Sequence, residues 1–269
     1  MNRVPFADGQ LAYDDIGAGP PVLFLHDGTL DRRVWERQLR AFDGYRVLNL
    51  DARGHGESST PMTPYLRGDD VIALLDHLEL SSAFLVGQAM GGTSALDTAL
   101  DHPTRVEGLV LSGCGTSEQY WRSEFMVDAL KRQMECAFRA DTDGYLELFL
   151  RMWVDGPNRQ PDEVDPSIRE RCRQLALHTA TRHARPDPVM PGRAKDTWDR
   201  LPQVGAPVLG IVGELDLVDV REMLDRVVSE VPDAKLDVFA GTGHMVNMEQ
   251  PQRFNTTVRR FLDGLSGLG

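Results

Sequence analysis

The sequence predicts an α/β fold in which a mostly parallel β-sheet is covered by helices on both faces. Two observations support this prediction. Short, uninterrupted apolar runs recur along the chain, and segments with helical spacing of apolar residues lie between them. Strands buried on both faces of a parallel sheet have such continuous runs, and parallel strands are usually connected by helices. A chain of 269 residues is long enough for one such domain with an additional helical segment.

The first elements are predicted to form a β-hairpin, because residues 4–6 and 11–13 flank the turn dipeptide Asp8-Gly9. The strands of the parallel sheet are predicted to follow at residues 22–25, 47–50, 84–86, 109–111, 208–212 and 236–239. Helices are predicted at residues 31–42, 69–80, 90–100, 219–231 and 251–262, the last with Pro251 in its first turn. This alternation indicates βαβ units.

One long interval breaks the alternation. Residues 114–199 contain no convincing buried strand, and helical patterns cover residues 118–140, 144–154 and 167–181. Prolines separate these patterns. We therefore predict a core made of residues 1–113 and 200–269, with residues 114–199 inserted as a helical lid, or cap.

The composition excludes several classes of function. With 29 basic and 41 acidic residues, the net charge of −12 argues against a nucleic-acid partner or an anionic membrane. The N-terminus lacks the apolar region of a signal peptide, and no apolar run approaches the ~20 residues of a membrane span. The three cysteines show no metal-binding spacing. We expect reduced thiols, a cytoplasmic location, a small-molecule substrate, and neither a metal nor an organic cofactor.

The segment Gly87-Gln88-Ala89-Met90-Gly91 lies where a predicted strand turns directly into a helix. It matches the nucleophile elbow G-x-S-x-G at every position except one. Small residues are needed there because the strand and helix backbones approach closely. The nucleophile position holds Ala89, which has no atom that can attack a carbonyl group.

Four further features accompany the elbow. Leu25-His26-Asp27-Gly28-Thr29 ends the first parallel strand, and the segment 51–58 ends the next with the pattern D-x-R-G-x-G-x-S. Asp216 ends a later strand, and His244 lies in a loop just before the last helix. This chain order of nucleophile position, acid and histidine is typical of α/β-hydrolases.

These motifs together resemble the α/β-hydrolase superfamily, in particular its lid-bearing lactonases, esterases and carbon–carbon bond hydrolases. The resemblance implies that His244 is the general base and Asp216 the acid that orients it. It also implies that the backbone N–H groups of Gly28 and Met90 form the oxyanion hole. Asp27 departs from the pattern, because the family has glycine there. Asp219 is the alternative acid, with helix capping as its structural role.

Several other side chains have a structural and a functional interpretation. Asp27, Trp121 and Trp153 are candidate substrate-binding residues. Asp27 would repel a substrate carboxylate or bind a hydroxyl group, or else accept hydrogen bonds from nearby loop amides. The tryptophans, with Trp198, would otherwise form the core of the lid. The remaining candidates are expected to be structural rather than catalytic, namely Arg53, His55, Ser94 and Cys114.

Ala89 allows three interpretations. In the first, serine is the natural residue and the chain is an engineered, substrate-trapping variant of an ester or lactone hydrolase, inactive without its nucleophile. In the second, Ala89 is natural and His244 with Asp216 acts as a base dyad in non-hydrolytic chemistry, as a cyclase, lyase, decarboxylase or cofactor-free oxygenase. In the third, the chain is a non-catalytic binding protein on a hydrolase fold.

Overall fold

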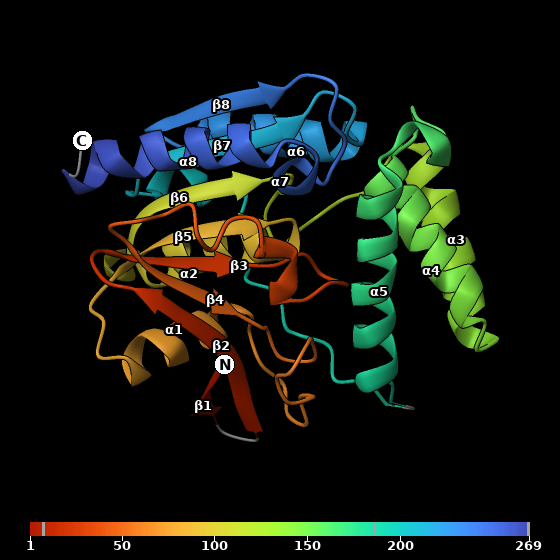
Figure 1. The fold of residues 1–269 in the computed structure, drawn as a ribbon, viewed down its shortest axis with the longest axis horizontal. Coiled ribbons are helices and arrows are strands. Elements are labelled where there is room, and N and C mark those ends of the chain that lie inside the picture. The colour runs from red at the N-terminus through yellow and green to blue at the C-terminus, as the bar shows by residue number, and fades with distance from the viewer. Residues whose placement is uncertain (7–8, 186, 268–269) are drawn as a thin grey trace.

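The computed structural model describes residues 1–6, 9–185 and 187–267, and a single central sheet organises them. The sheet has eight strands in the order β1-β2-β4-β3-β5-β6-β7-β8 (Figure 1). The pairs β1–β2 and β2–β4 are antiparallel, and every other neighbouring pair is parallel. The predicted fold class is therefore confirmed.

The strands lie where apolar runs predicted them. Their bounds are β1 Asn2–Phe6, β2 Gly9–Gly17, β3 Pro21–Leu25, β4 Arg46–Leu50, β5 Ala83–Gln88, β6 Val106–Ser112, β7 Val208–Gly213 and β8 Ala234–Phe239. The first two form the predicted hairpin, although Asp8 of its turn lies outside the described residues. Because β3 to β8 run parallel, their carboxyl ends meet at one edge of the sheet.

Helices cover both faces of the sheet. The helices of the core are α1 Gly68–His77, α2 Met90–Asp101, α6 Val218–Glu230, α7 Val246–Glu249 and α8 Pro251–Ser266. Short 3₁₀ turns lie at η2 Pro103–Arg105 and η5 Leu201–Gln203.

Alternation along the strands separates two hydrophobic cores. Leu23 and Leu25 of β3 point into the core that α1, α2 and α6 cover, whereas Val22 and Phe24 point into the core that α8 and residues 146–176 cover. Side chains of a strand alternate between the two faces of a sheet, so a continuous apolar run fills both cores at once.

The segment between β6 and β7 is helical and forms a group beside the carboxyl edge of the sheet (Figure 1). It contains α3 Glu124–Phe138, α4 Thr142–Leu150, one π-helical turn η3 Arg151–Asp155, the 3₁₀ turn η4 Pro161–Glu163 and α5 Pro166–Arg182. The first helix begins later than predicted, because the Ser123 hydroxyl accepts a hydrogen bond from Met126 N and caps it.

One predicted helix was wrong. Residues 31–42 form only the 3₁₀ turn η1 Arg32–Trp35, followed by further turns. Tertiary contacts replace helical packing there: Gln38 Nε2 donates to the Asn247 carbonyl, and the Trp35 ring packs 5.2 Å from Phe24. The apolar spacing of this segment reflects burial in the core rather than an α-helix.

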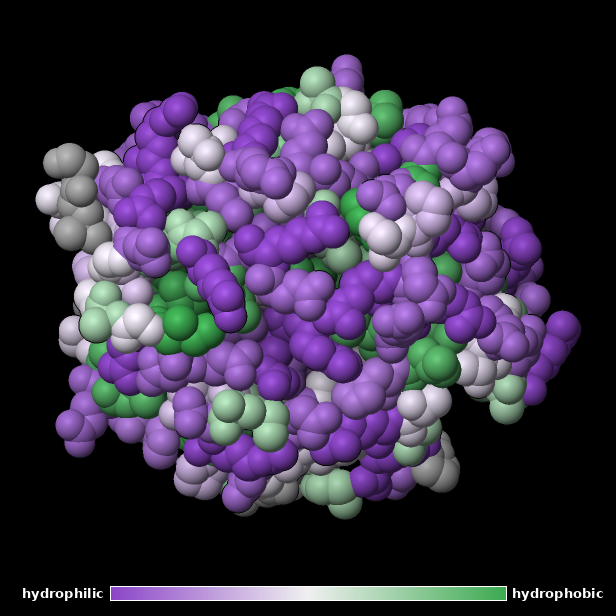
Figure 2. Space-filling view, in the orientation of Figure 1, coloured by the Kyte–Doolittle hydropathy of each residue, from purple (hydrophilic) through white to green (hydrophobic). Residues whose placement is uncertain are grey.

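The surface is mainly hydrophilic in the view of Figure 2, with hydrophobic residues in separate areas. Within the described residues, no helix combines the length and apolar character needed to cross a bilayer. The three cysteines are free thiols, and Cys114 and Cys172 are buried.

Candidate active site

The turn between β5 and α2 places Ala89 at the carboxyl edge of the sheet. Ala89 has φ 45° and ψ −109°, a conformation that residues with a Cβ rarely adopt. The turn is tight because Gly91 packs against the end of β3, where an added Cβ would overlap the Leu25 carbonyl. The backbone geometry of a nucleophile elbow is therefore present, but the side chain at its tip is a methyl group.

His244 and Asp216, predicted as a pair, are in contact. His244 lies in the loop after β8, and its Nδ1–H donates to the Asp216 carboxylate, 2.9 Å from Oδ2 and 3.1 Å from Oδ1. Both residues are buried. Gly113, at the end of β6, makes room for the pair, because a Cβ there would lie 2.9 Å from Cε1 of His244.

Asp219, the alternative acid, makes hydrogen bonds that connect two helices instead of contacting His244. Its carboxylate accepts hydrogen bonds from the hydroxyl and the backbone N–H of Ser123 and from the N–H of Arg122. Asp219 therefore joins the start of α6 to the start of α3, and does not contact the imidazole of His244.

Asp27 faces the other nitrogen of His244. Oδ2 of Asp27 lies 3.5 Å from Nε2, and both side chains are buried. Within the described residues, this buried Nε2 has no hydrogen-bond partner, so the contact with Asp27 is an ion pair. Oδ1 of Asp27 accepts a hydrogen bond from the Thr29 N–H at 3.1 Å. The imidazole thus lies between two carboxylates.

These charges decide the protonation state of His244. Burial by itself would lower the pKa of the imidazole, but the hydrogen-bonded carboxylate of Asp216 and the negative charge of Asp27 outweigh it and raise the pKa to about 10. At neutral pH His244 is therefore an imidazolium ion. A histidine that accepts a proton from a serine must instead begin as neutral imidazole.

The Gly28 amide is oriented by His26. Nε2 of His26 accepts a hydrogen bond from the Ala52 N–H, so the proton is on Nδ1, which donates to the Asp27 carbonyl at 2.7 Å. The C=O of Asp27 and the N–H of Gly28 belong to one trans peptide group and point in opposite directions. The Gly28 N–H therefore points away from His26.

The two predicted oxyanion donors lie on neighbouring segments. An added Cβ on Gly28 would lie 3.4 Å from Cβ of Met90, the first residue of α2. The first N–H groups of a helix have no acceptor within the helix, and the helix dipole favours negative charge at that end. The arrangement is suited to binding a carbonyl oxygen that becomes negative.

A cavity of about 630 Å³ lies between these segments and the lid. All the predicted substrate-binding and oxyanion residues line it, as does Ala89: Asp27, Gly28, Ala89, Met90, Trp121 and Trp153. His244 is only 3% exposed and is absent from this lining. The Trp153 ring packs 4.8 Å from the imidazole. Asp27 and Trp153 therefore separate His244 from the cavity.

The other sequence candidates have local partners. The pKa of His55 is lowered to about 4, mainly by burial and also by His26, and its two ring nitrogens face the carbonyls of Arg53 and Gly28. The hydroxyl of Ser94 donates to the Met90 carbonyl at 2.8 Å and so is not aimed at the cavity. Trp198 packs against Tyr120 instead of lining the cavity, and Cys114 lies against Gly92.

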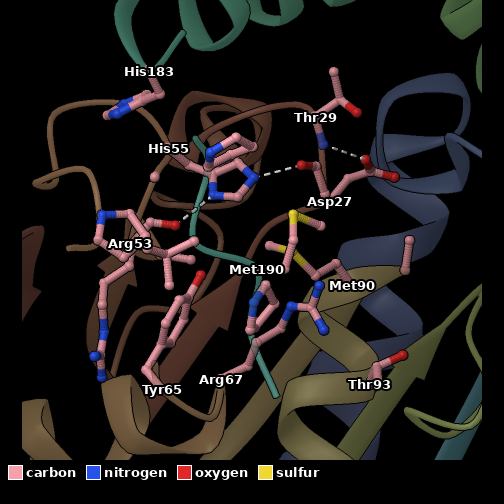
Figure 3. A pocket seen from close by; sticks show the side chains of 18 of the residues that line it. Asp27, Thr29, Arg53, His55, Tyr65, Arg67, Met90, Thr93, His183 and Met190 are labelled. Carbon is pink, nitrogen blue, oxygen red and sulfur yellow. Dashed lines mark hydrogen bonds between the residues drawn. The ribbon is translucent and has the colours of Figure 1, made fainter. Parts of the chain in front are cut away.

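Sequence reasoning missed a second part of the cavity. Tyr65, Arg67 and Arg193 line it, and the close-up view draws Arg67 with its guanidinium directed toward the centre, where Met90 and Met190 lie (Figure 3). No motif contains these residues. Only the three-dimensional arrangement distinguishes them from the many surface arginines.

In the described part of the chain, no three His, Cys, Asp or Glu side chains are grouped in a way that would hold a metal ion.

Comparisons with known proteins agree with this architecture. The family model of the alpha/beta hydrolase family matches residues 22–257. A 2-hydroxy-6-oxononadienedioate/2-hydroxy-6-oxononatrienedioate hydrolase of Burkholderia vietnamiensis is 31% identical over 93% of this chain and 90% of its own. The 3-oxoadipate enol-lactonase 2 of Acinetobacter baylyi is 29% identical over 89% of this chain and 87% of its own.

Among solved structures, an N-acyl homoserine lactone degrading enzyme is similar, with 27% identity and a TM-score of 0.76. The match covers 97% of this chain and 100% of that one. The strand order, the elbow, the His244–Asp216 pair and the family match agree. The chain belongs to the α/β-hydrolase family.

Proposed function

We propose that this chain catalyses proton transfer beside the carbonyl group of a small substrate, without a covalent intermediate. Asp27 is the group that faces the substrate, and His244 with Asp216 stands behind it. One observation carries this proposal. The Asp27 carboxylate lines the cavity, and its Oδ2 lies 3.5 Å from Nε2 of His244. Asp27 therefore stands between the substrate and the nitrogen with which the histidine of a hydrolase acts. Natural Ala89 is consistent with this arrangement.

The proposed step begins with the substrate carbonyl oxygen at the N–H groups of Gly28 and Met90. The Asp27 carboxylate takes a proton from the carbon next to the carbonyl. The electron pair of that C–H bond moves to the carbonyl oxygen, and the resulting enolate is stabilised by the two amides. The His244 imidazolium supplies positive charge beside Asp27 and keeps its own proton. The protonated Asp27 then returns its proton to the enolate, which restores the carboxylate. Isomerisation and elimination both proceed through such an enolate.

The same contacts disfavour serine-type hydrolysis. Because the His244 imidazole is held as a cation, it cannot accept a proton from a nucleophile at position 89 until its own proton leaves. The negative charge of Asp27, one residue before the Gly28 amide, also opposes a second negative charge in the oxyanion hole. Two positions of the family pattern, 27 and 89, differ together, which favours a changed chemistry over a single engineered substitution.

The test is exchange of carbon-bound protons with solvent. Benzoylpropionamide, a neutral ketone, is incubated with the protein in deuterated water, and loss of the proton signals next to the ketone is followed by NMR. We expect the chain to accelerate exchange. Asp27→Asn and His244→Ala should each reduce the accelerated rate by about 100-fold or more, the usual contribution of a general base.

Ser94→Ala serves as the matched control, because this hydroxyl lies near the elbow but is bonded to the Met90 carbonyl. Its exchange rate should equal that of the unchanged chain. Asp27→Asn retains the size of the side chain, so the loss of rate reports on the charge once circular dichroism shows that the variant is folded. Unaccelerated exchange by the chain, or full activity in Asp27→Asn, would contradict the proposal.

Hydrolysis of an ester or lactone by a serine at position 89 is the second candidate function. The observation that favours it is the strained φ of 45° at Ala89, a conformation that non-nucleophilic chemistry does not require. The names of the related enol-lactonase and lactone degrading enzyme also support it. In this interpretation the chain with Ala89 binds its substrate and does not turn it over.

A further inference from the structure

We propose that Arg67 and Arg193 form a carboxylate-binding subsite in the cavity, so that the substrate carries a carboxylate in addition to its reactive carbonyl. This rests on the proposed function only in taking the cavity as the substrate site. A pair of arginines in the cavity is unexpected in a chain whose net charge is −12.

Arg67 has no direct ion-pair partner among the described residues. It immediately precedes α1, is half-buried and lines the cavity. In the described residues, its guanidinium makes neither a hydrogen bond nor an ion pair within 4.0 Å. Burial lowers the pKa of Arg67, which means that the site as it stands disfavours the charge. A charged group withdrawn from water without a partner costs free energy that binding an anion would recover.

The other two arginines of the cavity already have partners. Arg53 forms a buried ion pair with Asp70, and its guanidinium also lies 4.4 Å from the ring centroids of both Phe6 and Tyr65. Arg185 lies 3.2 Å from the carboxylate of Asp187. The unpaired state of Arg67 is therefore not a general property of arginines in this cavity.

A backbone hydrogen bond brings a second unpaired cation to the same place. The N–H of Gly192 donates to the Tyr65 carbonyl at 2.7 Å, which fixes the segment before β7 against the segment before α1. Arg67 and Arg193 follow these two residues closely in sequence. The positive charge of Arg193 further lowers the pKa of Arg67. Two like charges held together are unfavourable until an anion lies between them.

The nearby acidic and phenolic groups do not replace that anion. Asp97 of α2 attracts Arg67, but its carboxylate accepts from the Ser117 hydroxyl, and burial raises its pKa to about 6. Asp70 is committed to Arg53. The Tyr65 hydroxyl is neutral at physiological pH, since burial raises its pKa further above its ordinary value.

The chemistry of the subsite selects a carboxylate. Guanidinium groups bind carboxylates through paired N–H donors. Met90 and Met190 lie near Arg67 (Figure 3), and Pro191 also lines the cavity. Met90 contributes both to this lining and to the oxyanion hole. The substrate is therefore oriented with its carboxylate at Arg67 and its carbonyl at Gly28 and Met90.

The test compares two probes that differ only in charge. Binding of benzoylpropionate and of benzoylpropionamide is measured by isothermal titration calorimetry. We expect the acid to bind about 10- to 100-fold more tightly than the amide. Arg67→Gln should remove most of this preference, Arg193→Gln should reduce it, and Arg67→Lys should retain part of it. Affinity for the amide should change less than about threefold in each variant.

Arg185→Gln is the matched control, because Arg185 lines the same cavity but has its own carboxylate partner. The preference of this variant for the acid over the amide should equal that of the unchanged chain. Arg67→Gln should also unfold at the same temperature as the unchanged chain or higher, because a desolvated charge is removed. Equal affinity for acid and amide, an unchanged preference in Arg67→Gln, or no saturable binding of the acid would overturn the subsite. Binding does not depend on Asp27, so failed proton exchange with preserved acid preference would refute the proposed function alone.

Discussion

At the scale of single residues, two neighbouring departures from the family pattern act on one another. Ala89 lacks the hydroxyl group that serine has at this position in the family pattern. Asp27 places a carboxylate 3.5 Å from the imidazole of His244. The first change alone would leave an inactive hydrolase. The second converts the imidazole into the buried centre of a carboxylate–imidazolium–carboxylate row. The site can be understood only when both positions are considered together.

This coupling predicts the result of restoring the nucleophile. Ala89→Ser alone should increase hydrolysis of p-nitrophenyl acetate less than about 10-fold, because Asp27 keeps His244 protonated. The double variant Ala89→Ser with Asp27→Gly should exceed the single variant by about 100-fold or more, since losing a serine nucleophile costs up to about a millionfold in comparable triads. The rate of p-nitrophenol release in a single turnover under excess enzyme measures acylation directly. Full activity from Ala89→Ser alone would instead support an engineered serine hydrolase.

At the scale of elements, one ion pair attaches the lid to the loop that carries His244. Arg159 lies in the lid between η3 and η4, and its Nη1 donates to Oε2 of Glu249 in α7 at 2.6 Å. Oε1 of Glu249 also accepts from the N–H of Gly243, next to His244, at 3.0 Å. Both side chains are about nine-tenths buried. The segment between β6 and β7 therefore holds the loop of His244 in place through Arg159 and Glu249.

Removing this contact should be costly. Arg159→Met leaves the Glu249 carboxylate buried without its partner, and we expect a loss of about 3 kcal/mol in the free energy of unfolding. Urea denaturation followed by circular dichroism measures it. Arg132→Met removes an exposed pair with Asp128 in α3 and should change stability by less than about 1 kcal/mol. Equal effects of the two substitutions would show that the lid attachment does not depend on Arg159.

At the scale of the whole molecule, charge is distributed unevenly. The chain carries a net charge of −12, yet its cavity contains two arginines without carboxylate partners in the described residues. An acidic surface favours solubility and disfavours anionic macromolecules. A small anion is different, because the guanidinium groups at short range in a partly desolvated cavity outweigh screened charges farther away.

The raised pKa of His244 predicts how the stability of the whole molecule depends on pH. The pKa rises from 6.5 to about 10 on folding, so the native state keeps a proton that the unfolded chain loses. This stabilisation is complete below pH 6.5 and is lost as pH rises toward 10. Between pH about 6.5 and about 8.5 the free energy of unfolding should fall by up to about 1.4 kcal/mol per unit.

Urea titrations across that range measure the slope. The other perturbed histidines have lowered pKa values, so their effect on the free energy of unfolding no longer changes above about pH 6.5. The buried thiols of Cys114 and Cys172, whose pKa values are raised, contribute only at higher pH. Asp27→Asn should make the slope shallower by lowering the pKa of His244. A stability that is constant across this range would show that His244 is not held as a cation.

The sequence by itself determined the fold, and it predicted Ala89, Asp216 and His244 as the reactive centre but not the role that we propose for Asp27. Apolar runs reveal strands buried on both faces, and Ala89, Asp216 and His244 stand within local motifs, where a turn or a strand end requires particular residue types. The helix predicted at residues 31–42 failed because apolar spacing reports burial, which turns can satisfy as well. Only the tertiary structure decided that Asp27 faces His244, that His244 lies behind the cavity wall, and that Arg67 and Arg193 lack partners. Protonation and charge pairing depend on distances between groups far apart in the chain, and no local pattern encodes those distances.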